Sequence, residues 1–92
     1  MWALAINPIS GAGQGAVVGT YIAGFLSQRS IPYLIITGNS AVALAKNLAG
    51  FIANYPDCEG VIAVGGDGLT HIVLQKTTPA QIPLAVIPAG TG

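Results

Sequence analysis

Asp67 has a glycine on each side in VIAVGGDGLTHIV, the sequence of residues 61–73. It is one of only three acidic residues in the chain. An apolar run comes directly before the glycines, so the segment has the form of a buried strand followed by a loop. Glycines let backbone N–H groups approach an anion closely, and a carboxylate is a good ligand for a hard cation such as Mg²⁺. The pattern predicts a site for a phosphate, or for a metal ion bound to a phosphate.

A second interpretation of Asp67 is structural, because Asp is a favoured N-cap residue at the start of a helix. The nearby His71 has no second His or Cys beside it, so we interpret it as a core or surface residue rather than a ligand or base. Cys58 is the single cysteine, which excludes an internal disulfide and a cysteine-rich metal site. We interpret Lys46 and Lys76 as solvated surface charges.

Two further glycine-containing segments follow apolar runs. NPISGAGQG covers residues 7–15, and PAGTG covers residues 88–92. In an open parallel sheet the carboxyl ends of the strands share one edge, and ligands bind where the strand order reverses. The helix after each loop would add free N–H donors and the positive end of its dipole. The first loop has the spacing GxGxG and no following Lys, so it fits neither the dinucleotide fingerprint nor a Walker P-loop.

Apolar runs and helical periodicity alternate along the chain. The predicted strands are residues 2–6, 32–37, 61–64 and 84–88, and the predicted helices are residues 15–28, about 40–55 and 69–75. Strands that are apolar throughout indicate a parallel sheet covered on both faces. The predicted fold is therefore α/β, a three-layer doubly wound parallel sheet. If the first strand is central, the first two glycine loops flank the switch point.

The composition excludes several classes of protein. The 92 residues suffice for one small domain, and they are 52% hydrophobic and 7% charged with a formal net charge of zero. A nucleic acid partner is not expected, since there is no basic face. The apolar stretch at 15–26 is shorter than the ~20 residues of a spanning helix. No Lys or Arg precedes it as in a signal peptide, so we expect a soluble, cytoplasmic protein.

Three motifs in this order, NPISGAGQG, VIAVGGDGLTHIV and LAVIPAGTG, resemble the catalytic domain of diacylglycerol kinases and their relatives, the sphingosine, ceramide and bacterial lipid kinases. The resemblance covers essentially all 92 residues. The GGDG motif alone is shared with NAD kinases and 6-phosphofructokinases, whereas NP-x-SG-x-G favours the lipid kinases. The fold that it implies is the nucleotide-binding domain of the phosphofructokinase and NAD kinase type.

The resemblance also implies ATP and Mg²⁺ as cofactors and assigns residues to the site. Asp67 would be the catalytic carboxylate. The implied nucleotide-binding residues, from three loops, are Asn7, Ser10, Gly11, Gly65, Gly66, Asp67, Gly68, Gly90, Thr91 and Gly92. Many relatives have Thr where Leu69 stands, Glu where Ile72 stands, and Lys or Arg at position 12 or 14, where this chain has Ala12 and Gln14. The missing cation weakens the case for tight triphosphate binding by the first loop.

The implied function is an ATP-dependent lipid kinase, which transfers the γ-phosphoryl group of ATP to a lipid hydroxyl of the diacylglycerol or sphingoid type. One alternative is a GGD-type kinase for a small substrate such as NAD. Another is a non-catalytic module that binds a nucleotide or a partner. No general base for the acceptor hydroxyl is identified.

In the family the last motif continues with Asn and then Asp or Ala, and a β-rich domain follows that helps to hold the lipid. We therefore expect residues 1–92 to be the N-terminal part of the catalytic domain, to lack activity alone and to associate with a second copy through an open sheet edge. We also expect the full-length protein to contact a membrane peripherally.

Overall fold

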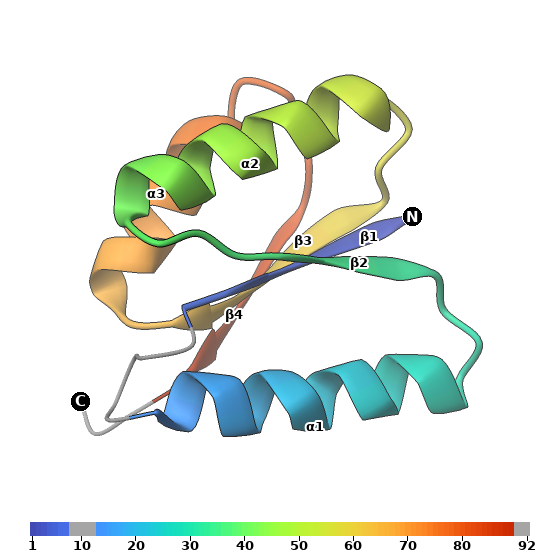
Figure 1. Ribbon diagram of the computed structural model, residues 1–92. Helices are drawn as coiled ribbons and strands as arrows, with labels where there is room; N and C mark the ends of the chain where they lie inside the picture. Colours follow the sequence, from blue (N-terminus) through green and yellow to red (C-terminus); the bar gives the residue numbers. More distant parts are fainter. Residues whose placement is uncertain (8–12, 90–92) are drawn as a thin grey trace.

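The structure is a computed structural model, and it describes residues 1–7 and 13–89. Strands and helices alternate along it in the predicted order (Figure 1). The elements are β1 (Trp2–Ile6), α1 (Gln14–Gln28), β2 (Tyr33–Ile36), α2 (Ala41–Asn54), β3 (Gly60–Gly65), α3 (Asp67–Thr77) and β4 (Leu84–Pro88). β1 and β4 have the predicted bounds, and the ends of the other elements lie within two residues of the predicted ones. The longer α3 matters most, because it already begins at Asp67.

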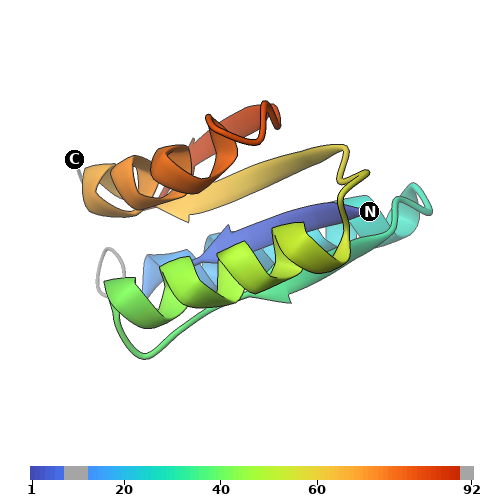
Figure 2. The ribbon, with the colours of Figure 1, turned by 90° about the horizontal axis from the view of Figure 1, so that it is seen from above.

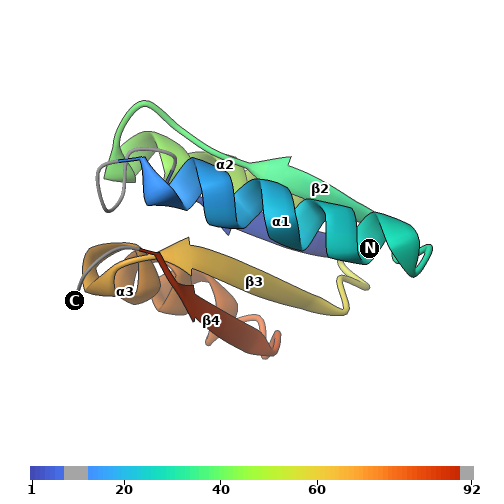
Figure 3. The same ribbon diagram turned by 90° about the horizontal axis from the view of Figure 1, so that it is seen from below.

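The strands form one parallel sheet in the order β2-β1-β3-β4. β1 lies between β2 and β3, as predicted, so the direction of winding reverses after β2. Right-handed crossovers then put α1 on one face of the sheet and α2 and α3 on the other, as Figures 1 and 3 show. The predicted three-layer, doubly wound α/β fold is confirmed.

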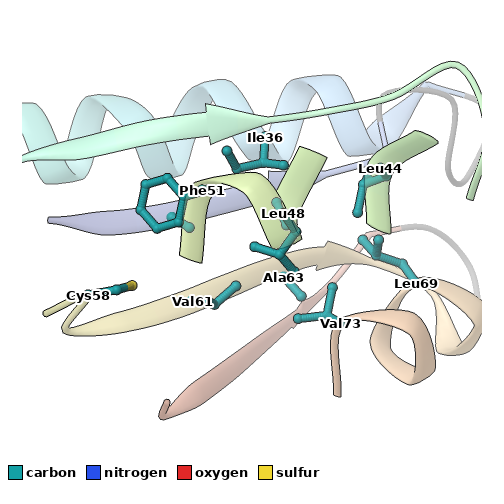
Figure 4. Packing of buried hydrophobic residues seen from close by; sticks show 11 residues of the cluster. Ile36, Leu44, Leu48, Phe51, Cys58, Val61, Ala63, Leu69 and Val73 are labelled. Carbon is teal, nitrogen blue, oxygen red and sulfur yellow. The ribbon is translucent and has the colours of Figure 1, made fainter. Parts of the chain in front are cut away.

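The larger core lies between the sheet and the α2–α3 layer. Helix α2 contributes Leu44, Leu48 and Phe51, which point toward the strands in Figure 4. Alanines on the strands, such as Ala63, leave room for these large side chains. Leu48 is fully buried. This packing fixes the position of α2, and with it the loop that precedes the helix.

The smaller core lies under α1, where Leu4, Ile6 and Val64 are buried. Helix α1 comes close to β1 because Gly19 has no side chain: a Cβ there would overlap Cδ1 of Ile6. α1 is also the longest helix in the described part of the chain, with 15 residues. Among the described residues, no helix has both the length and the apolar character needed to cross a bilayer.

Truncation of Leu48 tests this core. We expect Leu48→Ala to lower the free energy of unfolding by about 2–5 kcal/mol, because it leaves a cavity between α2 and the sheet. Val42→Ala, in the same helix but at an exposed position, is the control and should change it by less than about 0.5 kcal/mol. Urea unfolding followed by circular dichroism measures both variants, and equal effects would contradict the packing of α2.

Candidate functional site

The carboxyl ends of three strands are tied together at one edge of the sheet. The backbone N–H of Asn7 donates to the carbonyl of Val64 over 3.2 Å, and the N–H of Ala89 donates to the carbonyl of Gly65 over 3.3 Å. Asn7 and the loop at residues 65–68 therefore lie at the same rim, as the predicted strand order requires. The other predicted site residues, Ser10, Gly11, Gly90, Thr91 and Gly92, lie outside the described residues.

The loop between β3 and α3 turns the chain directly into a helix. Gly65 ends the strand and Gly66, in extended conformation, is the N-cap of α3. The carbonyl of Gly66 accepts from the backbone N–H and the hydroxyl of Thr70, at 3.1 and 3.2 Å. No side chain caps this helix. The N–H groups of its first turn are thus available for an anion at the rim.

Asp67 is the first residue of α3 and not its N-cap. The alternative interpretation of Asp67 as the N-cap is therefore wrong, because Gly66 occupies that position. The side chain is exposed and makes no hydrogen bond or ion pair with the described part of the chain. A carboxylate at this position is favoured by the helix dipole. It is also available to a ligand.

The described part of the rim offers a magnesium ion one carboxylate ligand, that of Asp67. In the described ranges, no group of three or more His, Cys, Asp or Glu side chains could hold a metal ion. Asp67 could therefore supply a single protein ligand. Mg²⁺ is often bound by one or two carboxylates together with phosphate oxygens and water, so this sparse donor set is compatible with a nucleotide-linked Mg²⁺.

A pocket of about 520 Å³ lies beside the rim, on the side of α2 and α3. Its walls are Asn7 after β1, residues 38–41 with Leu44 after β2, and Gly68, Leu69 and Ile72 of α3. None of these side chains is charged. The volume falls in the range of small-molecule sites, and mostly apolar walls with a few amides and hydroxyls are typical of them.

The wall after β2 is the part of the site that was not predicted from the sequence. Its residues 38–40 are GNS, which is typical of a turn that ends in a helix cap. Ser40 is indeed the N-cap of α2, and its Oγ accepts from the N–H of Ala43 at 3.1 Å. Asn47 Nδ2 donates to the carbonyl of Thr37 over 2.7 Å and holds the loop against α2. The predicted strand order could have found this wall, since β2 ends at the same edge as β1.

His71 and Cys58 take no part in the pocket. His71 is exposed, and its Nε2 lies 3.2 Å from Nε2 of Gln75, which agrees with a surface histidine. Cys58 is buried before β3, where its thiol donates to the carbonyl of Gly60 over 3.3 Å. The thiol packs in the larger core.

The fold and the rim define a doubly wound α/β domain with a pocket at the edge of the sheet where ligands bind in such folds. The sequence model of the diacylglycerol kinase catalytic domain matches residues 1–92. The chain therefore belongs to the diacylglycerol kinase catalytic domain family, which is a family of kinase-type enzymes. The resemblance seen in the sequence is confirmed.

Two curated proteins are similar to the chain, each named "Diacylglycerol kinase", from the CDC 1551 / Oshkosh and ATCC 25618 / H37Rv strains of Mycobacterium tuberculosis. Each is 35% identical over 86 residues, which is 94% of this chain. The chain spans only 27% of the length of these relatives. No solved structure gives a significant match.

A substitution at Gly38 tests the wall after β2. A Cβ at Gly38 would overlap the backbone nitrogen of Leu44 and lie 2.8 Å from the carbonyl carbon of Ala43. We expect Gly38→Ala to lower the free energy of unfolding by about 1–3 kcal/mol, because backbone must move. Gly50→Ala, within α2 with nothing near its Cβ, should instead raise it by about 0.5–1 kcal/mol. Thermal and urea unfolding distinguish the two, and a neutral Gly38→Ala would show that the loop is not held against α2.

Proposed function

We propose that the protein is an ATP-dependent lipid kinase, of which this chain is the nucleotide-binding part. It would transfer the γ-phosphoryl group of ATP to the hydroxyl of a lipid of the diacylglycerol or sphingoid type. The observation that carries the proposal is the start of α3, where a glycine loop, uncapped N–H groups and the unpaired carboxylate of Asp67 lie beside an uncharged pocket. Membership of the family and the name of the curated relatives support it.

Phosphoryl transfer asks a protein mainly to position the phosphates and to neutralise their charge. In this proposal the N–H groups of the first turn of α3 bind phosphate oxygens, since the end of a helix dipole favours an anion there. Asp67 would hold a phosphate-bound Mg²⁺, which supplies positive charge against the phosphate oxygens. The two glycines before Asp67 leave the loop backbone open to the ligand.

The pocket would take the uncharged part of the nucleotide, its base and sugar. Leu44 and Leu69 contribute apolar side chains to its lining, while Asn7, Asn39 and Ser40 contribute amide and hydroxyl groups. A pocket without charged side chains is poorly suited to a triphosphate and well suited to a base. Base and phosphates would then lie on the two sides of Gly68.

The acceptor side of the reaction is not part of the rim described above. We expect the acceptor site in the β-rich domain of the family. We propose diacylglycerol as an acceptor of the whole kinase because the curated relatives are named "Diacylglycerol kinase". An assay that offers diacylglycerol, a sphingoid base and NAD as acceptors separates this proposal from a kinase for a small substrate.

An NMR titration tests the nucleotide site. ATP with Mg²⁺ should shift the amide signals of residues 7–15 and 65–69 together, because Asn7 and the loop at residues 65–68 lie at the same rim. Residues 38–40 should move with them, since they line the same pocket. Amides at the opposite end of the sheet, around Glu59 and Ile82, serve as the internal control. Shifts confined to that end would rule out the site.

Asp67→Asn tests the proposed carboxylate. The substitution keeps the size of the side chain and removes its charge, so turnover should fall on the order of 100-fold or more with little change in the unfolding midpoint. Asp57→Asn removes the same charge from an exposed position between α2 and β3 and should leave turnover unchanged. Phosphate transfer from labelled ATP to diacylglycerol by the full-length enzyme is the measurement, since residues 1–92 alone are expected to be inactive. Near-wild-type turnover of Asp67→Asn would remove the main support for the assignment.

A further inference from the structure

A second groove, of about 420 Å³, runs between α2 and α3 on the outer surface of the helical layer. Figure 2 shows the two helices side by side on this face. Alanines of α2 and Ile72 of α3 line the groove, and Lys46 and Lys76 lie along it. Ala41 and Ile72 also line the rim pocket, so the groove and the pocket are neighbours.

The groove is a positively charged part of a nearly uncharged chain. Lys46 and Lys76 are two of only three basic residues, and no acidic residue lines the groove. Neither lysine forms an ion pair with any described residue; the ion pair seen there joins the N-terminal ammonium of Met1 to Glu59, 3.6 Å apart. Lys76 is also half-buried. Its aliphatic stem packs along the groove while its ammonium has no counter-ion.

An apolar side chain stands beside the two cations. Val42 lines the same groove and is 79% exposed, although it lies in the first turn of a helix that otherwise packs well. Exposed aliphatic groups next to lysines without partners are typical of surfaces that lie on lipid headgroups, where both kinds of group are satisfied together.

We propose that this groove, the α2–α3 groove, binds the headgroups of anionic phospholipids and so places the protein on a membrane. Lys46 and Lys76 would bind headgroup phosphates, and Val42 would contact the boundary between headgroups and acyl chains. The inference rests on the proposed function in one respect, that the acceptor lipid lies in the same membrane. Because the groove and the rim pocket share Ala41 and Ile72, the phosphoryl donor would then lie close to the membrane surface.

The charges disfavour a second copy of the chain as the occupant. The lysines would need acidic partners, and the chain has only Asp57, Glu59 and Asp67. Glu59 already pairs with the N-terminus. Asp57 and Asp67 are separated by the length of β3, so the two carboxylates do not form a matching acidic patch. An anionic bilayer offers a dense layer of phosphates and needs no such match.

Vesicle co-sedimentation without ATP is the experiment. The protein should bind mixed vesicles that contain equal amounts of phosphatidylcholine and phosphatidylglycerol. It should bind vesicles of phosphatidylcholine alone much more weakly. Lys46→Gln and Lys76→Gln should each lower the partition coefficient about fivefold, and the double variant should lower it further. The matched control is Arg29→Gln, which removes one positive charge at the C-terminus of α1 on the other face of the sheet. It should bind as the wild type does.

Val42→Ser separates the apolar contribution from the charges. It should weaken binding while the dependence of binding on salt stays the same, whereas the lysine variants should make binding less sensitive to salt. Equal binding to both kinds of vesicle would overturn the proposal, and so would an equal loss in Arg29→Gln. The proposal would also be overturned if inorganic phosphate reduced vesicle binding more than chloride does at the same ionic strength, because that would indicate a site for free phosphate. Self-association that depends on the lysines, seen by light scattering without vesicles, would assign the groove to a second copy.

Failure of this inference can be told from failure of the proposed kinase function. Asp67→Asn should bind vesicles like the wild type, because the carboxylate lies at the rim and not in the groove. Conversely, the lysine variants of the full-length enzyme should keep their turnover on a short-chain diacylglycerol dispersed in detergent, where no membrane has to be bound. Loss of turnover there, with vesicle binding intact, would contradict the assignment of the groove.

Discussion

The parallel pairing of β1 with both β2 and β3 is the constraint on which the site depends. Because β1 is central and its residues from Ala3 to Ala5 are fully buried, the strand cannot shift its register without exposing a core face. The carboxyl ends of β1, β2 and β3 are therefore held at the same edge of the sheet. Asn7, residues 38–40 and the start of α3 are far apart in the sequence, and they line one pocket there.

The same constraint explains the low charge of the site. Helices cover both faces of the central strands, although Leu34, Ile35 and Val86 of the edge strands stay exposed. Free backbone N–H and C=O groups are concentrated where helices begin and end. The start of α3 uses backbone N–H groups as the positive element, and the single carboxylate of Asp67 lies beside them. Binding of an anion at such a rim needs no buried cation, which suits a chain with so few charged residues.

The fold was predictable from the sequence because its strands are short, uniformly apolar and separated by helical periodicity. The position of the GGDG loop followed from that order. The pocket wall after β2 and the α2–α3 groove were not predictable in the same way, since both arise from tertiary packing. Lys76 shows why: helical periodicity marks it as a solvated charge, whereas packing of α3 beside α2 leaves it half-buried. The start of α3 was also set too late, because glycines have low helix propensity.

Ile72 connects the two surfaces and gives their difference a chemical basis. The resemblance described in the sequence analysis implies Glu at this position in many relatives. Ile72 lies one helical turn before Lys76, at the spacing at which Glu and Lys side chains pair. A carboxylate here would stand between the rim pocket and the groove, where it could partner Lys76 and bring charge to the pocket wall. With Ile in its place the pocket stays uncharged and Lys76 has no partner on its own helix. The aliphatic side chain at position 72 thus adds no charge to the pocket wall and gives Lys76 no ion-pair partner one helical turn away.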